Sequence, residues 1–459
     1  MIRLVFLFFT VNVALAQQNW IGSWYGKLAI QGQEMRLNLH FTKDKDTWKG
    51  TLDSPDQGAF GIPATKVEIQ EDRLTFEVKN IGVSYTGVLK GEEIQGNFKQ
   101  GGMSVPMALS RKEPAVEKPK RPQEPIPPFP YREEEAVFKN GEAKLVGTLT
   151  LPQGEGPFAA VVLVSGSGPQ DRNEEILGHK PFLVIADHLT RNGIAVLRYD
   201  DRGTGQSSGV SFMDATSKDF MQDASAAVDY LQGHPLINKD QISVCGHSEG
   251  AMLAVMLGAE RRDLASIALL AGPGIKGDSL LLLQQVLIAR SEGMKEKEIQ
   301  ELNAFNKKLF SGMLVAKDMS SCREFVEGEF RKYARKLSKK EIKKYGSKEK
   351  FVEISTNTFV NPWMLYFLSY DPALDLTRVT CKVLALNGDK DLQVPSKENL
   401  SAIKRNVLNV TGNNKYEELP NLNHLFQETK TGAVSEYGQL EQTISPEVLN
   451  ILSEWFLAP

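Results

Sequence analysis

A serine flanked by glycines is the first feature of this 459-residue chain that suggests nucleophilic chemistry. Residues 246–250 read Gly-His-Ser-Glu-Gly and match the pattern Gly-x-Ser-x-Gly, which alone is a weak signal. The setting strengthens it, because an expected strand at 242–245 precedes the pattern and an expected helix follows from 251, as a nucleophile elbow requires. The glycines permit a sharp turn that presents the hydroxyl at the strand end. Ser248 is therefore the predicted nucleophile.

A serine hydroxyl needs a general base, and on a strand–helix elbow the partners follow in the order acid, then histidine. The chain has six histidines, and only His424 comes after Ser248. It lies in a loop after an expected strand near 416–419, so His424 is the predicted base. The loop 388–395 offers two acids, Asp389 and Asp391. We favour Asp391 as the residue that orients the base, and expect Asp389 to cap the turn.

Backbone N–H groups must stabilise the negative charge that develops on the substrate oxygen. One donor is expected from Glu249, directly after the nucleophile. The other is expected in the glycine-containing loop 165–169, after the strand 159–165, and we assign it to Ser167; a plain turn is the alternative. The cysteines and histidines have no metal-ligand spacing, so no metal is expected. The predicted chemistry needs no organic cofactor either.

The residues after 131 alternate short β-branched runs with helical patterns, which indicates a mostly parallel sheet covered by helices on both faces. Residues 131–151 are expected to supply antiparallel entry strands. Between 275 and 380 the sequence is helical and rich in lysine, and such a length predicts an inserted cap. The other expected strands are 159–165, 194–199, 241–245, 265–271 and 383–387, and the expected helices are 181–192, 220–233, 251–260 and 446–457.

The residues before this region form a different module. Residues 20–111 alternate apolar and polar side chains, and an aromatic-x-Gly-x-Leu pattern begins at Trp24, Trp48 and Tyr85. Both features predict an all-β antiparallel barrel or sandwich. A ligand- or glycan-binding module and a packing or dimerisation module both fit, and we favour the second. Residues 112–130 are rich in proline and charge and are expected to be an extended linker.

The first sixteen residues have the features of an export signal: Arg3, apolar residues at 4–9 and 11–15, and the small-x-small site at 14–16. A membrane anchor is the alternative, but the run is shorter than a spanning helix needs. No later segment is long and apolar enough to span a membrane. We expect a periplasmic or extracellular protein. The net charge of −3 gives no basic field for nucleic acid.

Residues 131–459 resemble the bacterial α/β-hydrolases grouped as serine aminopeptidase-like, and among those they are most similar to exported carboxylesterases. The resemblance implies an α/β-hydrolase fold, esterase activity on short acyl chains, and the assignment of Asp391 through its Gly-x-x-Asp pattern. One departure is Ser165, where many relatives have histidine; it leaves the backbone donor unchanged. The matching stretches are SGSGPQDRN (165–173), RYDDRGTGQSSG (198–209), GHSEG (246–250), LNGDKDLQVP (386–395) and LPNLNHLFQ (419–427).

The sequence therefore predicts a serine hydrolase that cleaves small-molecule or glycan-linked carboxylic esters. Two alternatives remain open. A peptidase that removes short N-terminal units would need an acid in the cap to bind a free amine. A non-catalytic binding protein would need a decayed site, which the intact serine, histidine, aspartate and elbow glycines argue against.

Overall fold

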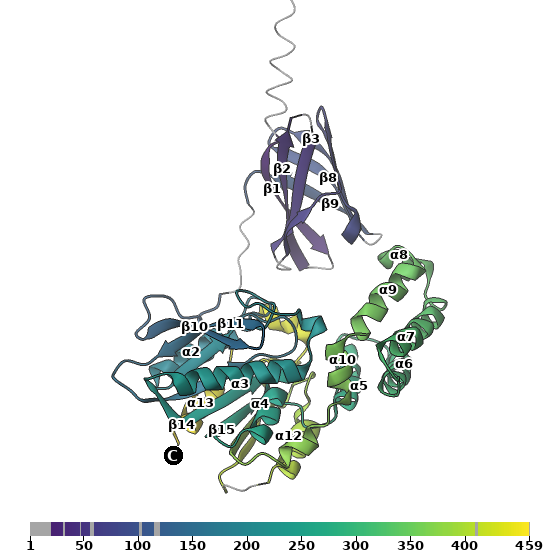
Figure 1. The fold of residues 1–459 in the computed structure, drawn as a ribbon. Helices are drawn as coiled ribbons and strands as arrows, with labels where there is room; N and C mark the ends of the chain where they lie inside the picture. The colour runs from purple at the N-terminus through teal and green to yellow at the C-terminus, as the bar shows by residue number, and fades with distance from the viewer. Residues whose placement is uncertain are drawn as a thin grey trace, which may run out of the picture. The chain divides into compact units, whose positions relative to one another are not determined.

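The computed structural model describes residues 20–30, 33–45, 47–55, 59–100, 103–113, 120–408 and 412–458 (Figure 1). The predicted export signal at 1–16 lies outside the described residues, as does part of the linker at 114–119. The chain divides into two compact units, 1–118 with 327–355 and 119–326 with 356–459. Each unit is described by itself.

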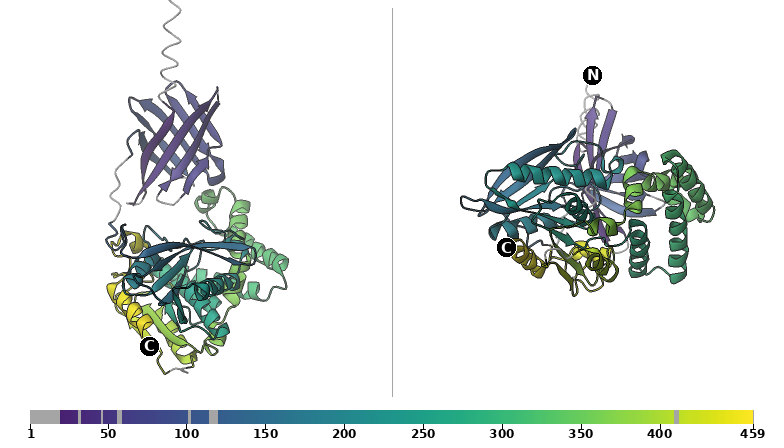
Figure 2. Two further views of the ribbon diagram at one scale, coloured as in Figure 1. Left: turned by 60° about the vertical axis from the view of Figure 1, so that its left-hand side comes forward. Right: turned by 60° about the horizontal axis from the view of Figure 1, so that its bottom comes forward.

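The N-terminal strands form one antiparallel nine-stranded sheet in the order β4-β3-β2-β1-β9-β8-β7-β6-β5. The sheet is barrel-like, and its strands curve round a common interior (Figure 2). This agrees with the predicted barrel-like domain. The strands are β1 (Gly22–Ile30), β2 (Gln33–Asp44), β3 (Thr47–Ser54), β4 (Ala59–Pro63), β5 (Lys66–Gln70), β6 (Arg73–Val78), β7 (Val83–Lys90), β8 (Glu93–Gln100) and β9 (Met103–Ser110), with a short 3-10 helix at Lys79–Ile81.

The glycines of the recurring pattern let the sheet curve onto its own interior. A Cβ at Gly50 in β3 would lie 3.1 Å from Phe76 of β6 and 3.2 Å from Val67 of β5, strands that follow much later in the sheet order. The buried Tyr85 donates its hydroxyl proton toward the carbonyl oxygens of Ile94 and Met107, at 3.0 and 2.9 Å. Large apolar side chains therefore fill the interior of this unit.

The second unit is built on an eight-stranded sheet in the order β10-β11-β13-β12-β14-β15-β16-β17. The entry strands β10 and β11 pair antiparallel, and β11 pairs antiparallel with β13, whereas the pairs from β13 to β17 are parallel. The strands are β10 (Arg132–Asn140), β11 (Ala143–Leu151), β12 (Phe158–Val164), β13 (Ala195–Tyr199), β14 (Ile237–His247), β15 (Ser266–Leu270), β16 (Lys382–Gly388) and β17 (Lys415–Leu419).

Helices cover both faces of this sheet, as its nearly continuous apolar strands require (Figure 1). On one face α3 and α4 pack against a core that includes Val244 and Ile267; on the other face α2 and α13 pack against Val161 and Leu384. The predicted helix 446–457 agrees with α13. These helices are α2 (Pro181–Arg191), α3 (Ser217–Gly233), α4 (Glu249–Glu260), α12 (Ser396–Asn406) and α13 (Pro446–Leu457), with 3-10 helices at Phe212–Asp214 and Val434–Gln439.

The long interval between β15 and β16 is helical, as the sequence predicts for an inserted cap. Within the second unit, α5 packs against α6 and α10. None of the helices in the described part of the chain is long and apolar enough to cross a membrane. The cap helices are α5 (Gly277–Ser291), α6 (Glu296–Leu314), α7 (Met319–Ala334), α8 (Lys339–Tyr345), α9 (Lys348–Phe359), α10 (Pro362–Ser369) and α11 (Pro372–Leu376).

The end of the predicted linker is fixed to the second unit. The Arg121 guanidinium donates hydrogen bonds to the carbonyl oxygens of Leu440 (2.6 Å), Gly438 (2.9 Å) and Gly178 (3.0 Å). The side-chain amide of Gln123 bonds the backbone of Ile444. The extended linker predicted for 112–130 is therefore docked over its described second half, because one arginine and one glutamine satisfy several loop carbonyls at once.

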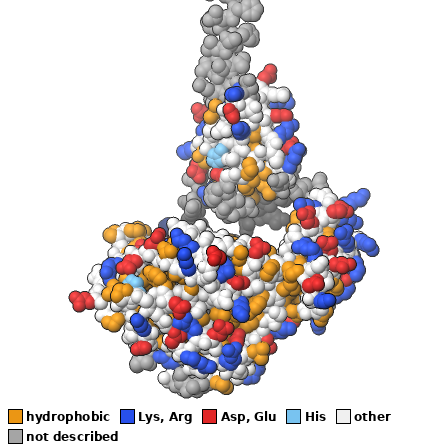
Figure 3. Space-filling view, viewed as in Figure 1, with side chains coloured by type: hydrophobic (Ala, Val, Ile, Leu, Met, Phe, Trp, Pro, Cys, Tyr) orange, Lys and Arg blue, Asp and Glu red, His pale blue; other side chains and the backbone are white. Residues whose placement is uncertain are grey.

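Charged side chains of both signs are interspersed on the face of the second unit that Figure 3 displays. Exposed ion pairs such as Arg290–Glu296, whose side chains are 53% and 57% exposed, are expected to contribute little to stability. The pair between Arg202 and Asp223 differs because it is buried. The guanidinium contacts both carboxylate oxygens at 2.7 Å, and Asn140 donates a third hydrogen bond at 2.8 Å. This group ties the loop after β13 to helix α3.

Asp223→Ala is expected to lower the free energy of unfolding of the second unit by about 3–5 kcal/mol, because the buried Arg202 charge loses both of its short carboxylate contacts and keeps only the more distant Asp219, at 3.7 Å, as an acidic partner. Asp229 is the matched control: it lies on the same helix and pairs with Arg261, but 62% of its side chain is exposed. Asp229→Ala should cost no more than about 1 kcal/mol. Denaturant unfolding of the two variants measures both values, and equal losses would contradict this account.

Candidate active site

Ser248 lies in a sharp turn between β14 and α4, with φ 54° and ψ −118°. Positive φ is strained for a residue with a side chain. The elbow has room only for glycine at positions 246 and 250. A Cβ on Gly246 would lie 2.0 Å from the carbonyl oxygen of Gly250, and a Cβ on Gly250 would lie 2.0 Å from the carbonyl oxygen of Val164. The Ser248 N–H donates to Leu270 O at 2.8 Å, which anchors the turn to β15. The local geometry is that of a nucleophile elbow.

The loops after β16 and β17 bring His424 and Asp391 together. Both side chains are buried, and His424 Nδ1 lies 2.8 Å from Asp391 Oδ2. The second oxygen, Oδ1, accepts the N–H groups of Gln393 (2.8 Å) and Val394 (2.9 Å). The neighbouring Asp389 is exposed. The carboxylate of Asp391 therefore holds Nδ1–H and leaves Nε2 as the basic nitrogen.

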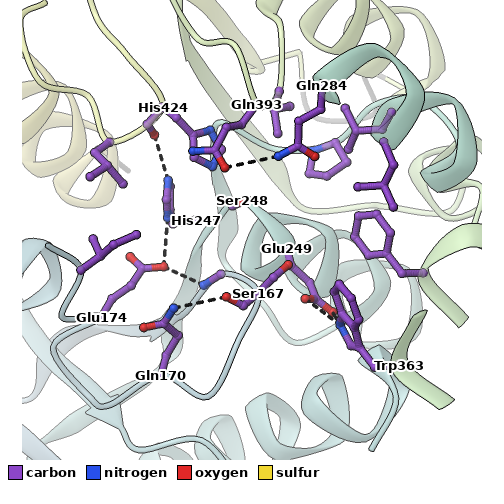
Figure 4. Close-up of a pocket in the computed structure, with 18 residues that line it drawn as sticks. Ser167, Gln170, Glu174, His247, Ser248, Glu249, Gln284, Trp363, Gln393 and His424 are labelled. Atoms are coloured by element: carbon purple, nitrogen blue, oxygen red, sulfur yellow. Dashed lines mark hydrogen bonds and ion pairs between the residues drawn. The ribbon is translucent and has the colours of Figure 1, made fainter. Parts of the chain in front are cut away.

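Ser248 and His424 line one cavity of about 280 Å³, together with Ser167 and Glu249 (Figure 4). Asp391 does not line the cavity but contacts His424, which does. Four of the five residues predicted for the site thus face a common space, and the fifth contacts one of them. The other lining residues are Gly166, Gln170, Glu174, Ile176, His247, Pro273, Leu280, Leu281, Gln284, Trp363, Phe367, Gln393, Val394 and Leu425.

The two residues predicted to supply backbone donors, Glu249 and Ser167, both line this cavity. Glu249 is the first residue of α4, where N–H groups lack intrahelical partners. On the opposite loop, Gly166 N–H is committed to Glu174 Oε1 at 2.6 Å. The next N–H along that loop belongs to Ser167, whose carbonyl oxygen accepts a bond from Gln170 at 3.2 Å. Ser165, where the resemblance suggests histidine, donates instead to the buried Asp201 at 2.9 Å.

The side chain of Glu249 links the elbow to the cap. Its carboxylate accepts hydrogen bonds from Ser217 Oγ (2.6 Å) and from Trp363 Nε1 of α10 (2.9 and 3.0 Å to the two oxygens). Burial raises the pKa of Glu249, and the bonds donated by Ser217, Ser167 and Trp363 oppose that shift. The donors fix the carboxylate beside the nucleophile and connect it with α10.

His247 and Glu174 make contacts that the sequence does not predict. His247 precedes Ser248, which excludes it as the base, and no motif marks Glu174. In the structure His247 Nδ1 lies 2.9 Å from Glu174 Oε1, and Nε2 lies 2.9 Å from the carbonyl oxygen of His424. The available signal was a histidine within the elbow and a glutamate close to the oxyanion loop, but nothing in the sequence relates the two.

The loop after β13 supports the oxyanion loop. Arg172 contacts both oxygens of Asp200, at 3.0 and 2.7 Å, and Asp201 Oδ2 accepts the N–H of Gln170 at 3.0 Å. Asp200 and Asp201 thereby fix the backbone and side chains that directly follow the loop 165–169. The described residues contain no group of three or more histidine, cysteine or acidic side chains placed to hold a metal ion.

Comparisons with known proteins agree with this geometry. The family model described as serine aminopeptidase, S33, matches residues 176–334, a segment that contains the elbow. Esterase EstD of Thermotoga maritima is 31% identical over 298 residues, which are 64% of this chain and 60% of EstD. The chain thus spans less than two thirds of that relative.

The elbow, the mostly parallel sheet and the family match agree on the architecture. The second unit has the α/β-hydrolase fold. Two solved structures are similar to it at low identity. They are the α/β hydrolase GrgF from Penicillium sp. sh18 (15% identical, TM-score 0.45, covering 71% of this chain and 98% of that one) and a Pyrococcus furiosus esterase (16%, 0.41, 72% and 90%).

Gly250→Ala is expected to disrupt the elbow, because the added methyl group would overlap backbone atoms of Val164 and Ser165. Gly258 lies in the same helix, and an added Cβ there would meet no atom closer than 3.4 Å. Gly258→Ala should leave stability unchanged or raise it by up to about 1 kcal/mol, since alanine is the better helix former. Thermal unfolding compares the two, and a stable Gly250→Ala protein would contradict the steric argument.

Proposed function

We propose that the protein hydrolyses carboxylic esters through a covalent acyl-enzyme on Ser248. The observation that carries the proposal is the 2.8 Å contact between His424 and Asp391, beside a cavity that His424 shares with the elbow serine. A serine is a useful nucleophile only when a base accepts its proton. The 31% identity to an esterase supports ester substrates.

The reaction follows from these positions. His424 Nε2 accepts the Ser248 proton as Oγ attacks the acyl carbon, and Asp391 stabilises the resulting imidazolium without itself taking the proton. The N–H groups of Ser167 and Glu249 stabilise the tetrahedral oxyanion, each donor contributing about 3 kcal/mol. His424 then gives its proton to the departing alcohol. Water repeats the sequence, with His424 as base, and releases the carboxylic acid and free Ser248.

The size and lining of the cavity favour short acyl chains. Its volume of about 280 Å³ is at the lower end of the range for small-molecule sites, about 300–1,000 Å³. The cap contributes Leu280, Leu281, Trp363 and Phe367 to its wall. Small apolar acyl groups fit such a wall, and the amides of Gln284 and Gln393 offer polar contacts to the alcohol part.

The cavity gives less support to an aminopeptidase. A free α-amino group needs a carboxylate with accepting capacity at the site. The described cap residues that line the cavity include no acid. Glu174 and Glu249 do line it, but both come from outside the cap and already accept hydrogen bonds from protein donors. We therefore rank the peptidase second, and the intact elbow and His424–Asp391 pair rank a non-catalytic binding protein third.

Export through residues 1–16, a packing or dimerisation role for the β domain, and glycan-linked esters as natural substrates complete the proposal. The export signal rests on the sequence alone. The filled interior of the β barrel favours a packing role over enclosure of a ligand.

Ser248→Ala is expected to abolish labelling by a fluorophosphonate probe and hydrolysis of p-nitrophenyl acetate, because no other group can form the acyl-enzyme. Rates for p-nitrophenyl acetate, longer acyl esters and aminoacyl p-nitroanilides then rank the candidate substrates. Labelling that persists without Ser248 would contradict the proposed nucleophile, and faster anilide cleavage would favour the peptidase.

Asp391→Asn is expected to lower kcat by about 10⁴-fold with the fold retained, since an amide in this place favours the wrong imidazole tautomer. Asp389→Asn is the matched control, because Asp389 lies two residues away and its side chain is exposed. It should keep kcat within about twofold, in line with the small effects of surface substitutions. If the two variants lose activity equally, Asp391 is not the orienting acid.

A further inference from the structure

The contacts of His247 determine its protonation state. Its Nδ1 faces a carboxylate oxygen of Glu174 at 2.9 Å, and its Nε2 faces the carbonyl oxygen of His424 at 2.9 Å. A carbonyl oxygen only accepts hydrogen bonds, and Glu174 Oε1 already accepts the Gly166 N–H at 2.6 Å. Both ring nitrogens must therefore donate, and only the imidazolium form can do so.

The charged groups around His247 favour that form. Burial by itself lowers the pKa of His247, but the charge of Glu174 and the hydrogen bonds to Glu174 and the His424 carbonyl outweigh it and raise the pKa, with a further contribution from Asp391. The His424 ring is also close, with centroids 4.8 Å apart. The nearby Cys245 thiol is buried, and burial raises its pKa, so it stays neutral.

We propose that Glu174 and His247 form a buried ion pair that positions the catalytic machinery, in a role that rests on the proposed function. One continuous chain of hydrogen bonds runs from Gly166 N–H to Glu174, from His247 Nδ1–H to Glu174, and from His247 Nε2–H to the His424 carbonyl. It connects the oxyanion loop after β12, the elbow at the end of β14 and the base loop after β17 (Figure 4).

The proposed positioning role requires that His247 is protonated. If His247 loses its proton, one ring nitrogen presents a lone pair to an oxygen, and one of the two links is lost. Because Glu174 raises the pKa of His247, the link is fully present below the ordinary pKa of a histidine and is lost as pH rises through the raised value. Neither residue touches the reacting atoms in the proposed reaction. Both are positioning residues.

The protonation state is measured directly by the ¹⁵N NMR signals of the imidazoles in the full-length protein. His247 is expected to carry two protonated nitrogens at pH 7 and to titrate above the ordinary range. His179 is an internal reference for a neutral ring, since burial lowers its pKa to about 4. His247→Gln assigns the signal by its disappearance. A neutral His247 at pH 7 would overturn the proposal.

Glu174→Gln tests the positioning role, because it keeps an acceptor oxygen but removes the charge. It should lower kcat about 10- to 100-fold with KM within about threefold, as small misplacements of catalytic groups do. The alkaline limb of the kcat profile should move to lower pH, because the charge that raises the pKa of His247 is gone. Glu175→Gln is the matched control: the Glu175 side chain is exposed and contacts Lys180 at 3.8 Å, so kcat and the pH profile should match those of the wild type.

His247→Gln provides a second variant, since its amide can still donate toward the His424 carbonyl but does not titrate. We expect a lower kcat and no alkaline limb. Wild-type kcat and an unshifted limb in Glu174→Gln, with the fold retained in thermal unfolding, would overturn the positioning role. The proposed function is tested separately: loss of Ser248-dependent fluorophosphonate labelling would remove the ester chemistry, while the NMR measurement would still decide whether the ion pair exists.

Discussion

Around Ser248 three backbone segments approach one another so closely that only glycine fits at two of the five elbow positions. Gly246 contacts the start of α4, and Gly250 contacts the end of β12. This steric constraint fixes where the strand ends and where the helix begins. It also places Glu249, the first residue of α4, at the cavity and holds Ser248 in a backbone conformation that a side chain rarely adopts. The neighbouring loops only need to bring His424 and the oxyanion donor to a serine that is already in place.

The proposed catalytic residues could be predicted because each has a signal in the sequence. The glycines mark Ser248, and the apolar strands on either side of the cap indicate a mostly parallel sheet. His424 is the only downstream histidine, and the Gly-x-x-Asp pattern of the resemblance favours Asp391 over Asp389. The structure places the favoured Asp391, and not Asp389, against His424. The apolar pattern also located α13 and the strands from β12 to β16, since buried parallel strands are almost continuously apolar.

The supporting contacts could not be predicted because their partners are far apart in the chain. Glu174 and His247 are 73 positions apart, and Glu249 and Trp363 are 114 apart. The sequence around a polar residue does not identify a hydrogen-bond partner far away in the chain. Such a bond therefore leaves no periodic pattern that sequence analysis could detect. The same holds for Arg121, whose proline-rich surroundings predict an extended linker although its side chain binds carbonyls more than 300 positions away. Long-range polar contacts thus complete a site whose reacting groups are set by local pattern.

The point at which the cap is inserted in the sequence affects how the length and composition of the cap can change in evolution. Its helices are inserted between β15 and β16, which are adjacent parallel strands. The chain must therefore close a loop of about 110 residues before those two strands can pair, and the entropy of closing such a loop grows only with the logarithm of its length. Doubling the insertion would cost only about 0.6 kcal/mol in closure entropy. Evolution can thus lengthen, shorten or replace the cap, and with it the walls that select a substrate, with little thermodynamic effect on the pairing of the strands beneath.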